Sequence, residues 1–249
     1  PGGLQPVAGE EGAGLGVPSH PPYPRVTALR LDGVPWKYAL VPLKLGVFQE
    51  IRDNILSGQP YQARGWFIYR QNPVNSLPER QKTLEAFNKM DFIVTTDIIM
   101  NDTAWFSDVV LPEACYLERY DPLATVDDKV YIRQPTIEPL GESKSGLWIF
   151  KQLGERLGLG DYFAYKDDED YLRQQLAPLK VPLEDLKQRG YVVMPSSAET
   201  KDAKLSWNTG SGKIELASSV LRDADFPAVP SWEEPPQAPE GQFYLLTGK

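Results

Sequence analysis

The chain has 249 residues, which is enough for one or two domains. Apolar residues make up 41% and charged residues 24%, a composition typical of globular proteins and not of disordered or collagen-like chains. The formal net charge is −8, and no Lys/Arg cluster offers a surface for phosphates, so no nucleic-acid partner is expected. No run approaches the ~20 apolar residues that a membrane-spanning helix needs.

Cysteine and histidine occur once each, as Cys115 and His20. Zinc and iron–sulfur sites take about four such ligands, so neither a disulfide framework nor a metal site of that kind fits within this chain. Cys115 lies in an apolar context and is predicted to pack as a small hydrophobe. His20 lies among prolines and is predicted to be a surface residue.

The beginning of the chain is predicted to be irregular over residues 1–40. Residues 1–24 contain six Gly and six Pro, a density that disfavours helix and sheet interiors. The chain has neither an initiator Met nor a signal-like region at its start, and it ends at Thr247-Gly248-Lys249 just after a strand-like run. We therefore expect a fragment of a longer protein.

The next part of the chain alternates short apolar runs with helical patterns. Ser57-Gly58 is a natural helix stop, and Ser76 and Glu79 have the spacing of a capping box, with Pro78 in the first turn. The expected elements are a helix at 45–56, a strand at 65–69, a helix at 78–90, a strand at 92–96, a short helix at 103–106 and a strand at 108–111.

Strands that alternate with helices predict right-handed crossovers and a parallel, Rossmann-like sheet with flanking helices, so the fold class is α/β. Ligands of such sheets bind beyond the carboxyl ends of the strands. The loops at 71–75 and 97–102 are therefore the predicted ligand edge.

The rest of the chain contains further helical patterns and an extended linker. We expect a strand at 130–133, helices at 146–157, 169–176 and 183–189, and a turn at Ser211-Gly212. Five prolines in residues 227–240 predict a linker. The predicted organisation is an irregular segment 1–40, a Rossmann-like domain 41–160, a helical extension 161–226, a linker 227–242, and the start of a β-barrel domain at 243–249.

The ligand edge lacks the usual phosphate-binding loop, since neither G-x-G-x-x-G nor the Walker pattern occurs. Asn72 and Asp97 remain as polar residues after two of the strands. Each is interpreted in two ways, as a ligand contact or as a turn or helix cap; an Asp there can accept two parallel hydrogen bonds from guanine. Glu118, Arg119 and Asp121 form either a solvated charge cluster or, through Arg119, a phosphate contact.

Several motifs together resemble one known family. They are Gln71-Asn72-Pro73, Thr96-Asp97, the run from Asp102 to Glu113, Leu117-Glu118-Arg119, the SGKIEL segment from Ser211 to Leu216, and Thr247-Gly248-Lys249. The order of these motifs is similar to that in the second Rossmann-like half of molybdopterin oxidoreductases of the dimethyl-sulfoxide-reductase family. Within that family, the sequence is most similar to the catalytic subunits of polysulfide and thiosulfate reductases.

The resemblance implies cofactors that this chain would only partly hold. The longer protein would carry molybdenum bis(molybdopterin guanine dinucleotide), together with a 4Fe-4S cluster and the metal's Cys ligand in the missing amino-terminal part. This segment would bind one dinucleotide and contain neither catalytic residues nor metal ligands. The implied cofactor contacts are Asn72, Thr96, Asp97, Arg119, Thr247 and Gly248.

The chain departs from the family pattern at three positions. Relatives often have Asp where this chain has Gly146, in the sequence Ser145-Gly146-Leu147-Trp148, so the contact made by that Asp is not expected. Arg119 stands where relatives have Lys. Cys115 stands where relatives have small residues, and it is not expected to bind the metal.

The resemblance implies a molybdenum oxidoreductase that reduces polysulfide or thiosulfate with electrons from quinol. Its partners would be an iron–sulfur subunit and a membrane anchor, on the periplasmic side of the cytoplasmic membrane. Two alternatives share the fold: a non-catalytic domain like that in the large iron–sulfur subunit of respiratory complex I, and a related enzyme acting on tetrathionate, arsenate, nitrate or formate. A stand-alone NAD-type dehydrogenase is disfavoured by the missing glycine loop. This segment alone is expected to be inactive.

Overall fold

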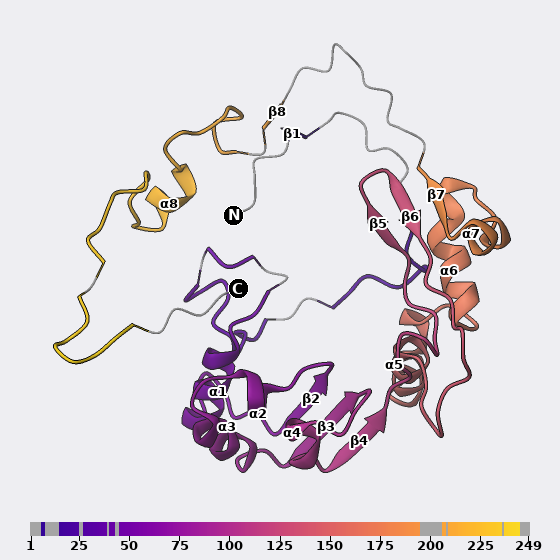
Figure 1. Cartoon of the computed structure of the whole chain (residues 1–249), viewed down its shortest axis with the longest axis horizontal. Coiled ribbons are helices and arrows are strands. Elements are labelled where there is room, and N and C mark those ends of the chain that lie inside the picture. The colour runs from indigo at the N-terminus through magenta and orange to yellow at the C-terminus, as the bar shows by residue number, and fades with distance from the viewer. Residues whose placement is uncertain are drawn as a thin grey trace. The chain divides into compact units, whose positions relative to one another are not determined.

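The computed structural model describes residues 6–7, 15–24, 27–38, 40–42, 45–194, 206–207, 209–235 and 237–244 (Figure 1). The chain divides into two compact units, one formed by residues 9–203 and the other by residues 1–8 together with 204–249. The first unit contains the predicted ligand edge. The domain boundaries predicted from the sequence stay predictions.

A three-stranded parallel sheet forms the first part of the larger unit, in the order β2-β3-β4. Its strands are β2 (Gly65–Tyr69), β3 (Phe92–Asp97) and β4 (Val109–Pro112). Its helices are α1 (Phe48–Ser57), α2 (Pro73–Ser76), α3 (Arg80–Phe87) and α4 (Asp102–Trp105). The predicted alternation of strands and helices and the parallel sheet are confirmed.

The predicted capping box at Ser76 and Glu79 is wrong. Ser76 ends the short helix α2, and α3 begins only at Arg80. Glu79 occupies the N-cap of α3 with a left-handed φ of 58°, and no side chain caps this helix. The carboxylate of Glu79 instead accepts a hydrogen bond from Arg52 Nη2 at 3.1 Å, so an ion pair to α1 replaces the local cap.

The crossover from β2 to β3 packs on one apolar cluster. Ile68, Val74, Phe87 and Ile93 are buried together, one from each of β2, α2, α3 and β3. Trp66 meets Phe87 edge to face, with 5.5 Å between ring centroids. Burial of these side chains determines which face of the sheet the helices cover. It therefore also holds the carboxyl ends of the strands in place.

The second part of the larger unit combines helices with an antiparallel sheet. The helices are α5 (Gly146–Arg156), α6 (Asp168–Leu176) and α7 (Leu183–Arg189), with 3-10 turns η1 (Gly160–Tyr162) and η2 (Ala177–Leu179). The sheet has the order β5 (Ala124–Val126), β6 (Lys129–Tyr131), β7 (Tyr191–Val193). The three predicted helices are confirmed. The predicted strand 130–133 is observed at 129–131, and its two partners were not predicted.

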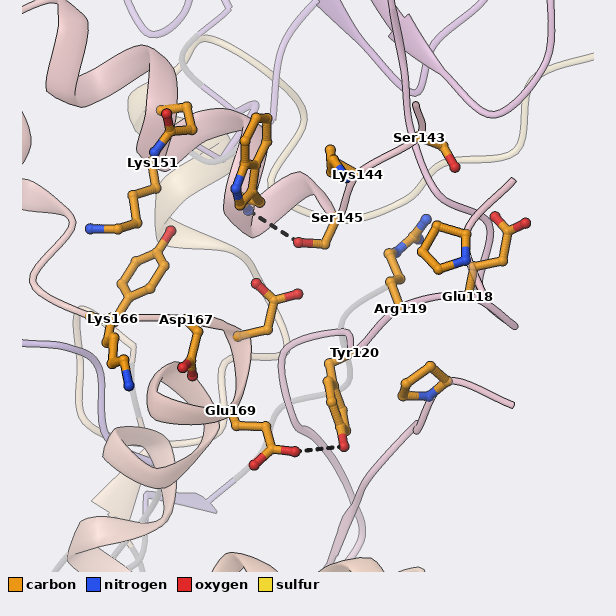
Figure 2. A pocket seen from close by; sticks show the side chains of 16 residues that line it. Glu118, Arg119, Tyr120, Ser143, Lys144, Ser145, Lys151, Lys166, Asp167 and Glu169 are labelled. Carbon is orange, nitrogen blue, oxygen red and sulfur yellow. Dashed lines mark hydrogen bonds between the residues drawn. The ribbon is translucent and has the colours of Figure 1, made fainter. Parts of the chain in front are cut away.

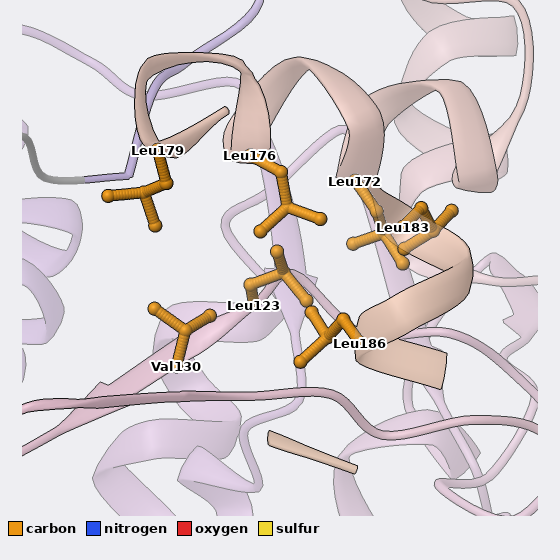
Figure 3. Close-up of a cluster of buried hydrophobic side chains, with 7 residues drawn as sticks. All are labelled: Leu123, Val130, Leu172, Leu176, Leu179, Leu183 and Leu186. Carbon is orange, nitrogen blue, oxygen red and sulfur yellow. The ribbon is translucent and has the colours of Figure 1, made fainter. Parts of the chain in front are cut away.

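A leucine-rich core joins these elements (Figure 3). Its buried members are Leu123, Val130, Leu172, Leu176, Leu179, Leu183 and Leu186. Leu172 and Leu186 have no exposed surface, and they come from α6 and α7. The core therefore fixes α6 and α7 against β6.

The smaller unit is described only in part. β1 (Pro6–Val7) pairs antiparallel with β8 (Ser206–Trp207), and α8 (Ser219–Asp223) follows. The predicted turn forms, since Gly212 N donates to Thr209 O at 3.0 Å. The described residues of 227–240 contain no helix or strand, as expected for a linker. Most of the predicted barrel start, residues 245–249, lies outside the described residues.

Two further expectations are tested in part. Of the irregular segment 1–40, residues 15–24, 27–38 and 40 contain no helix or strand, whereas Pro6 and Val7 form β1. No helix in the described ranges is both long and apolar enough to span a bilayer.

Truncating Leu172 tests the leucine-rich core. Leu172→Ala is expected to lower the free energy of unfolding by about 3 kcal/mol, because the change removes buried methyl groups and leaves a cavity. Urea titration of the protein measures the effect. Leu140→Ala is the matched control, since Leu140 is 83% exposed, and it is expected to change stability by less than about 0.5 kcal/mol. Equal losses in the two variants would contradict the assignment of the core.

Candidate functional site

The carboxyl ends of the three parallel strands carry charged and polar side chains. Arg70 follows β2, Asp97 ends β3, and Glu113 follows β4. Next to β4, Lys144 forms a parallel bridge with Glu113, and Ala114 N donates to Lys144 O at 2.9 Å. This bridge brings the amino end of α5 to the same edge, so all four segments meet at the predicted ligand edge.

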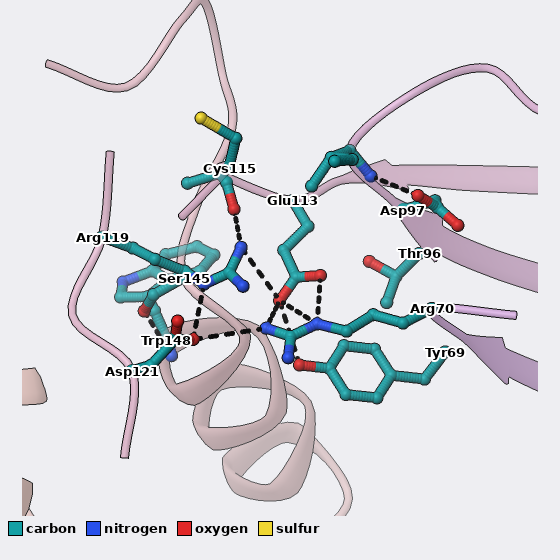
Figure 4. Close-up of polar contacts among 12 residues, drawn as sticks. Tyr69, Arg70, Thr96, Asp97, Glu113, Cys115, Arg119, Asp121, Ser145 and Trp148 are labelled. Carbon is teal, nitrogen blue, oxygen red and sulfur yellow. Dashed lines mark hydrogen bonds and ion pairs between the residues drawn. The ribbon is translucent and has the colours of Figure 1, made fainter. Parts of the chain in front are cut away.

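A buried carboxylate, that of Glu113, is the centre of this edge (Figure 4). Its side chain has no exposed surface. Tyr69 Oη donates to Oε1 at 3.0 Å, and Arg70 Nε donates to Oε2 at 2.8 Å. Arg119 Nη1 lies 3.7 Å from Oε1. Glu113 thus ties the ends of β2 and β4 to the segment that carries Arg119.

Asp121 is a second anion in the same network. It accepts from Arg119 Nε at 2.8 Å and from Arg133 Nη1 at 2.6 Å, and Arg70 Nη2 lies 3.7 Å away. Partial burial favours the protonated carboxyl, but the hydrogen bonds from Arg119 and Arg133 hold the pKa of Asp121 below its usual value. Asp121 therefore stays ionised and links three guanidinium groups.

Tyr69 stays protonated across the physiological range. Burial raises its pKa to about 12, and the negative charge of Glu113 adds to this shift. Its hydroxyl is therefore a fixed hydrogen-bond donor to Glu113.

Gly146, the first residue of α5, packs directly on this network. A Cβ at this position would lie 2.5 Å from Tyr69 Oη and 2.9 Å from Glu113 Oε1. Any side chain here would therefore have to displace the ends of Tyr69 and Glu113, and an Asp would disturb the Tyr69–Glu113 hydrogen bond.

Asn72 lies at the ligand edge, and the oxygen of its side-chain amide accepts hydrogen bonds from within the protein. Its Oδ1 accepts from Thr103 N at 3.2 Å and from Thr103 Oγ1 at 2.8 Å. These bonds join the loop after β2 to α4. The Nδ2 group donates no hydrogen bond to any described residue, so it can meet a ligand.

Asp97 is half-buried at the end of β3. Oδ1 accepts from Ile98 N at 2.7 Å, and Oδ2 accepts from Asn101 Nδ2 at 2.8 Å. Each carboxylate oxygen can accept a second hydrogen bond, so the turn orients Asp97 and leaves it able to bind a pair of ligand donors. The turn-capping interpretation and the ligand interpretation are thus compatible.

Thr96 is placed differently from its neighbour. Its side chain is fully buried, and Oγ1 donates to Leu111 O at 2.8 Å. The hydroxyl therefore holds β3 to β4 and does not face the ligand edge.

Arg119 is buried, so the interpretation of its cluster as solvated is wrong for this residue. Besides its ion pairs, Arg119 Nη1 donates to Ala114 O. Arg119 also lines a pocket of about 450 Å³ beside the start of α5, with Ser145 and Lys144 (Figure 2). In this pocket, burial raises the pKa of Asp168 above its usual value. Side chains of both charge signs line the pocket, among them Lys144 and Asp168.

The other residues singled out in the sequence are placed as follows. Thr247 and Gly248 lie outside the described residues, so their roles stay predictions. Cys115 is partly exposed, and its backbone N–H donates to Glu118 Oε2 at 2.7 Å. His20 is half-buried and packs against Tyr23, with ring centroids 4.5 Å apart. This partial exposure is compatible with the predicted surface position.

The sequence interpretation missed most of the ion network. Tyr69, Arg70, Glu113 and Arg133 were not selected, although Arg70 directly follows a predicted strand and Glu113 comes two positions after another. That position was a usable signal, since residues after parallel strands gather at one edge. The pairing of Glu113 with Tyr69 spans 44 positions and has no local signature.

The residues at this edge fit a guanine dinucleotide better than they fit a metal. Asp97 offers free acceptor capacity and Asn72 a free donor, as a guanosine requires. Across the described residues, no three His, Cys, Asp or Glu side chains gather to hold a metal ion.

Comparison with known proteins assigns the family. A family model described as "Molybdopterin oxidoreductase" matches residues 26–156, more than half of the chain. The chain belongs to the molybdopterin oxidoreductase family. Residues 26–156 include Asn72, Thr96, Asp97 and Arg119, so all of these lie within the matched region.

Individual relatives of this molybdopterin oxidoreductase chain are longer proteins. The thiosulfate reductase molybdopterin-containing subunit PhsA of Salmonella typhimurium is 28% identical over 255 residues, covering 91% of this chain and 34% of that protein. The probable oxidoreductase YyaE of Bacillus subtilis is 36% identical over 160 residues, covering 62% of this chain and 24% of that protein. This chain thus spans about a third or less of their length.

A solved structure supports the fold. Acetylene hydratase from Pelobacter acetylenicus superposes with a TM-score of 0.68 at 24% identity, over 76% of this chain and 26% of that one. The α/β architecture is therefore shared across members of the family.

Removing the charge of Glu113 tests the buried network. Glu113→Gln is expected to cost on the order of 3 kcal/mol of unfolding free energy, because Arg119 loses a buried counter-charge. Thermal or urea unfolding measures this loss. Asp91→Asn is the matched control, since the Arg64–Asp91 pair is exposed and should contribute less than about 1 kcal/mol. A Glu113→Gln variant as stable as the control would show that the network is dispensable.

The lowered pKa of Asp121 predicts a pH dependence. The pKa of Asp121 is lower in the folded state, so its stabilising effect is complete above the unfolded pKa near 4 and is lost as pH falls through the folded value. The stability difference between the unaltered protein and Asp121→Asn should therefore shrink below about pH 4. Urea unfolding at several pH values measures it; a difference that stays constant with pH would refute the assignment.

Proposed function

We propose that this chain is part of the catalytic subunit of a molybdenum oxidoreductase that reduces thiosulfate or polysulfide. The observation that carries the proposal is the similarity to a thiosulfate reductase subunit across 91% of the chain. The role of this chain in that enzyme is to hold one molybdopterin guanine dinucleotide at the carboxyl edge of β2–β4.

The contacts of the described residues support this role. Asp97 would accept the donor edge of the guanine, and Asn72 Nδ2 would donate to the same nucleoside. Thr247 and Gly248 would contact the pterin, as the family resemblance implies. When bound, the molybdenum cofactor supplies the two-electron redox chemistry, while this chain supplies binding, orientation and electrostatics.

The proposal extends to the whole enzyme. Electrons from quinol would arrive through a membrane anchor and an iron–sulfur subunit, and a 4Fe-4S cluster would lie in another part of the same polypeptide. The enzyme would act at the periplasmic face of the cytoplasmic membrane. The relative's description as a subunit supports partner chains of some kind.

Dye-linked turnover by the intact protein tests the substrate. With reduced viologen as electron donor, thiosulfate or polysulfide should be reduced faster than tetrathionate, arsenate or nitrate, and formate should not be oxidised. Faster turnover of another substrate would replace the sulfur-compound assignment and keep the molybdenum enzyme. No turnover together with no bound molybdenum would favour the non-catalytic alternative.

Asp97→Asn tests the guanosine contact. The substitution removes the charge and turns one acceptor into a donor facing the guanine donors, so cofactor retention after dialysis should fall at least about tenfold. Molybdenum and released guanine nucleotide, measured per polypeptide, report retention. Asp91→Asn is the control, because the Asp91 side chain is 56% exposed and lies before β3, at the opposite end of that strand from Asp97. Full retention in Asp97→Asn would contradict the contact.

A further inference from the structure

A separate pocket lies between the ion network and the antiparallel sheet. It has a volume of about 520 Å³ and is lined by Arg70, Asp121 and Arg133 together with apolar side chains such as Ala124 and Tyr131. Neither Asp97 nor Asn72 lines it. This pocket is therefore distinct from the residues proposed to hold the guanosine.

The charged groups around this pocket form a shared network. The guanidinium groups of Arg70, Arg119 and Arg133 share the carboxylates of Glu113 and Asp121, and Asp168 interacts electrostatically with Arg119 and Asp121. The charged side chains that line the pocket itself are two arginines, Arg70 and Arg133, and one carboxylate, Asp121.

Two of the arginines keep free donors at the pocket. Arg70 uses Nε and Nη2 on Glu113, and Arg133 uses Nη1 on Asp121. Arg70 Nη1 and Arg133 Nη2 donate no hydrogen bond to any described residue. The two side chains are 41% and 58% exposed, so these donors are open to solvent. Guanidinium donors match the oxygens of tetrahedral anions.

The backbone conformation of Arg70 is consistent with a binding role for its side chain. Arg70 has a φ of 52°, in the left-handed region that favours glycine. Its N–H still donates to Thr96 O at 3.1 Å, and its side chain is fixed by Glu113. Strained residues of this kind gather at binding sites, where neighbouring contacts maintain the conformation.

We propose that Arg70 and Arg133 bind a small tetrahedral oxyanion, such as sulfate or thiosulfate, in this pocket. The anion would accept from Arg70 Nη1 and Arg133 Nη2. Asp121 holds the two guanidinium groups beside each other. The inference goes beyond the proposed cofactor role and does not depend on which substrate the enzyme reduces.

Calorimetric titration of the intact protein with sulfate and thiosulfate tests the site. We expect saturable binding in low-salt buffer, weakened by added NaCl because the donors are partly exposed. Arg133→Gln should weaken binding at least about tenfold, because it removes a charged donor, and Arg133→Lys should weaken it less. Arg64→Gln is the matched control, since Arg64 is 82% exposed and lies before β2, at the opposite end of that strand from Arg70; it should leave binding unchanged.

Arg133 is chosen because its own side chain is 58% exposed, so its loss should preserve folding, which a thermal melt of the variant checks. Equal weakening by Arg64→Gln would show nonspecific charge attraction and overturn the proposal. Absence of sulfate and thiosulfate binding would also overturn it. A third titration uses guanosine diphosphate: if only this nucleotide binds, and Arg133→Gln weakens it, the pocket belongs to the dinucleotide phosphates and the free-anion proposal is wrong.

Discussion

The carboxylate of Glu113 has no exposed surface. Tyr69, Arg70 and Arg119 surround it, and their contacts compensate for the cost of its burial. A buried charge without such partners would cost several kcal/mol. Because these partners come from different segments, their contacts with one carboxylate set the distance between β2, β4 and the segment that carries Arg119. The ligand edge of the sheet therefore depends on this one ionised group.

The position of Gly146 follows from the same constraint. A side chain here would displace Tyr69 or Glu113, so α5 can approach the sheet edge only with glycine as its first residue. Asp97 and Asn72 lie within the region that matches the family model, which fits the proposal that this edge holds the cofactor.

Much of the fold could be predicted because the sequence patterns that specify it are local. Apolar runs predicted the strands at 65–69 and 92–96, and helical spacing of apolar residues predicted the helix at 146–157. The site could be predicted only where one residue follows one strand, as with Asn72 and Asp97. The Glu113 network joins residues far apart in sequence, and its members resemble ordinary surface charges until the strands bring them together. The same applies to β5 and β7, whose pairing with β6 depends on the leucine-rich core.

The molybdenum and guanine nucleotide content of the intact, natively purified protein tests the central claim most directly. If this chain holds one of two molybdopterin guanine dinucleotides, acid hydrolysis should release two guanine nucleotides for every molybdenum atom. A preparation that is folded but contains neither molybdenum nor guanine nucleotide would contradict the account and leave the sheet edge as a structural remnant.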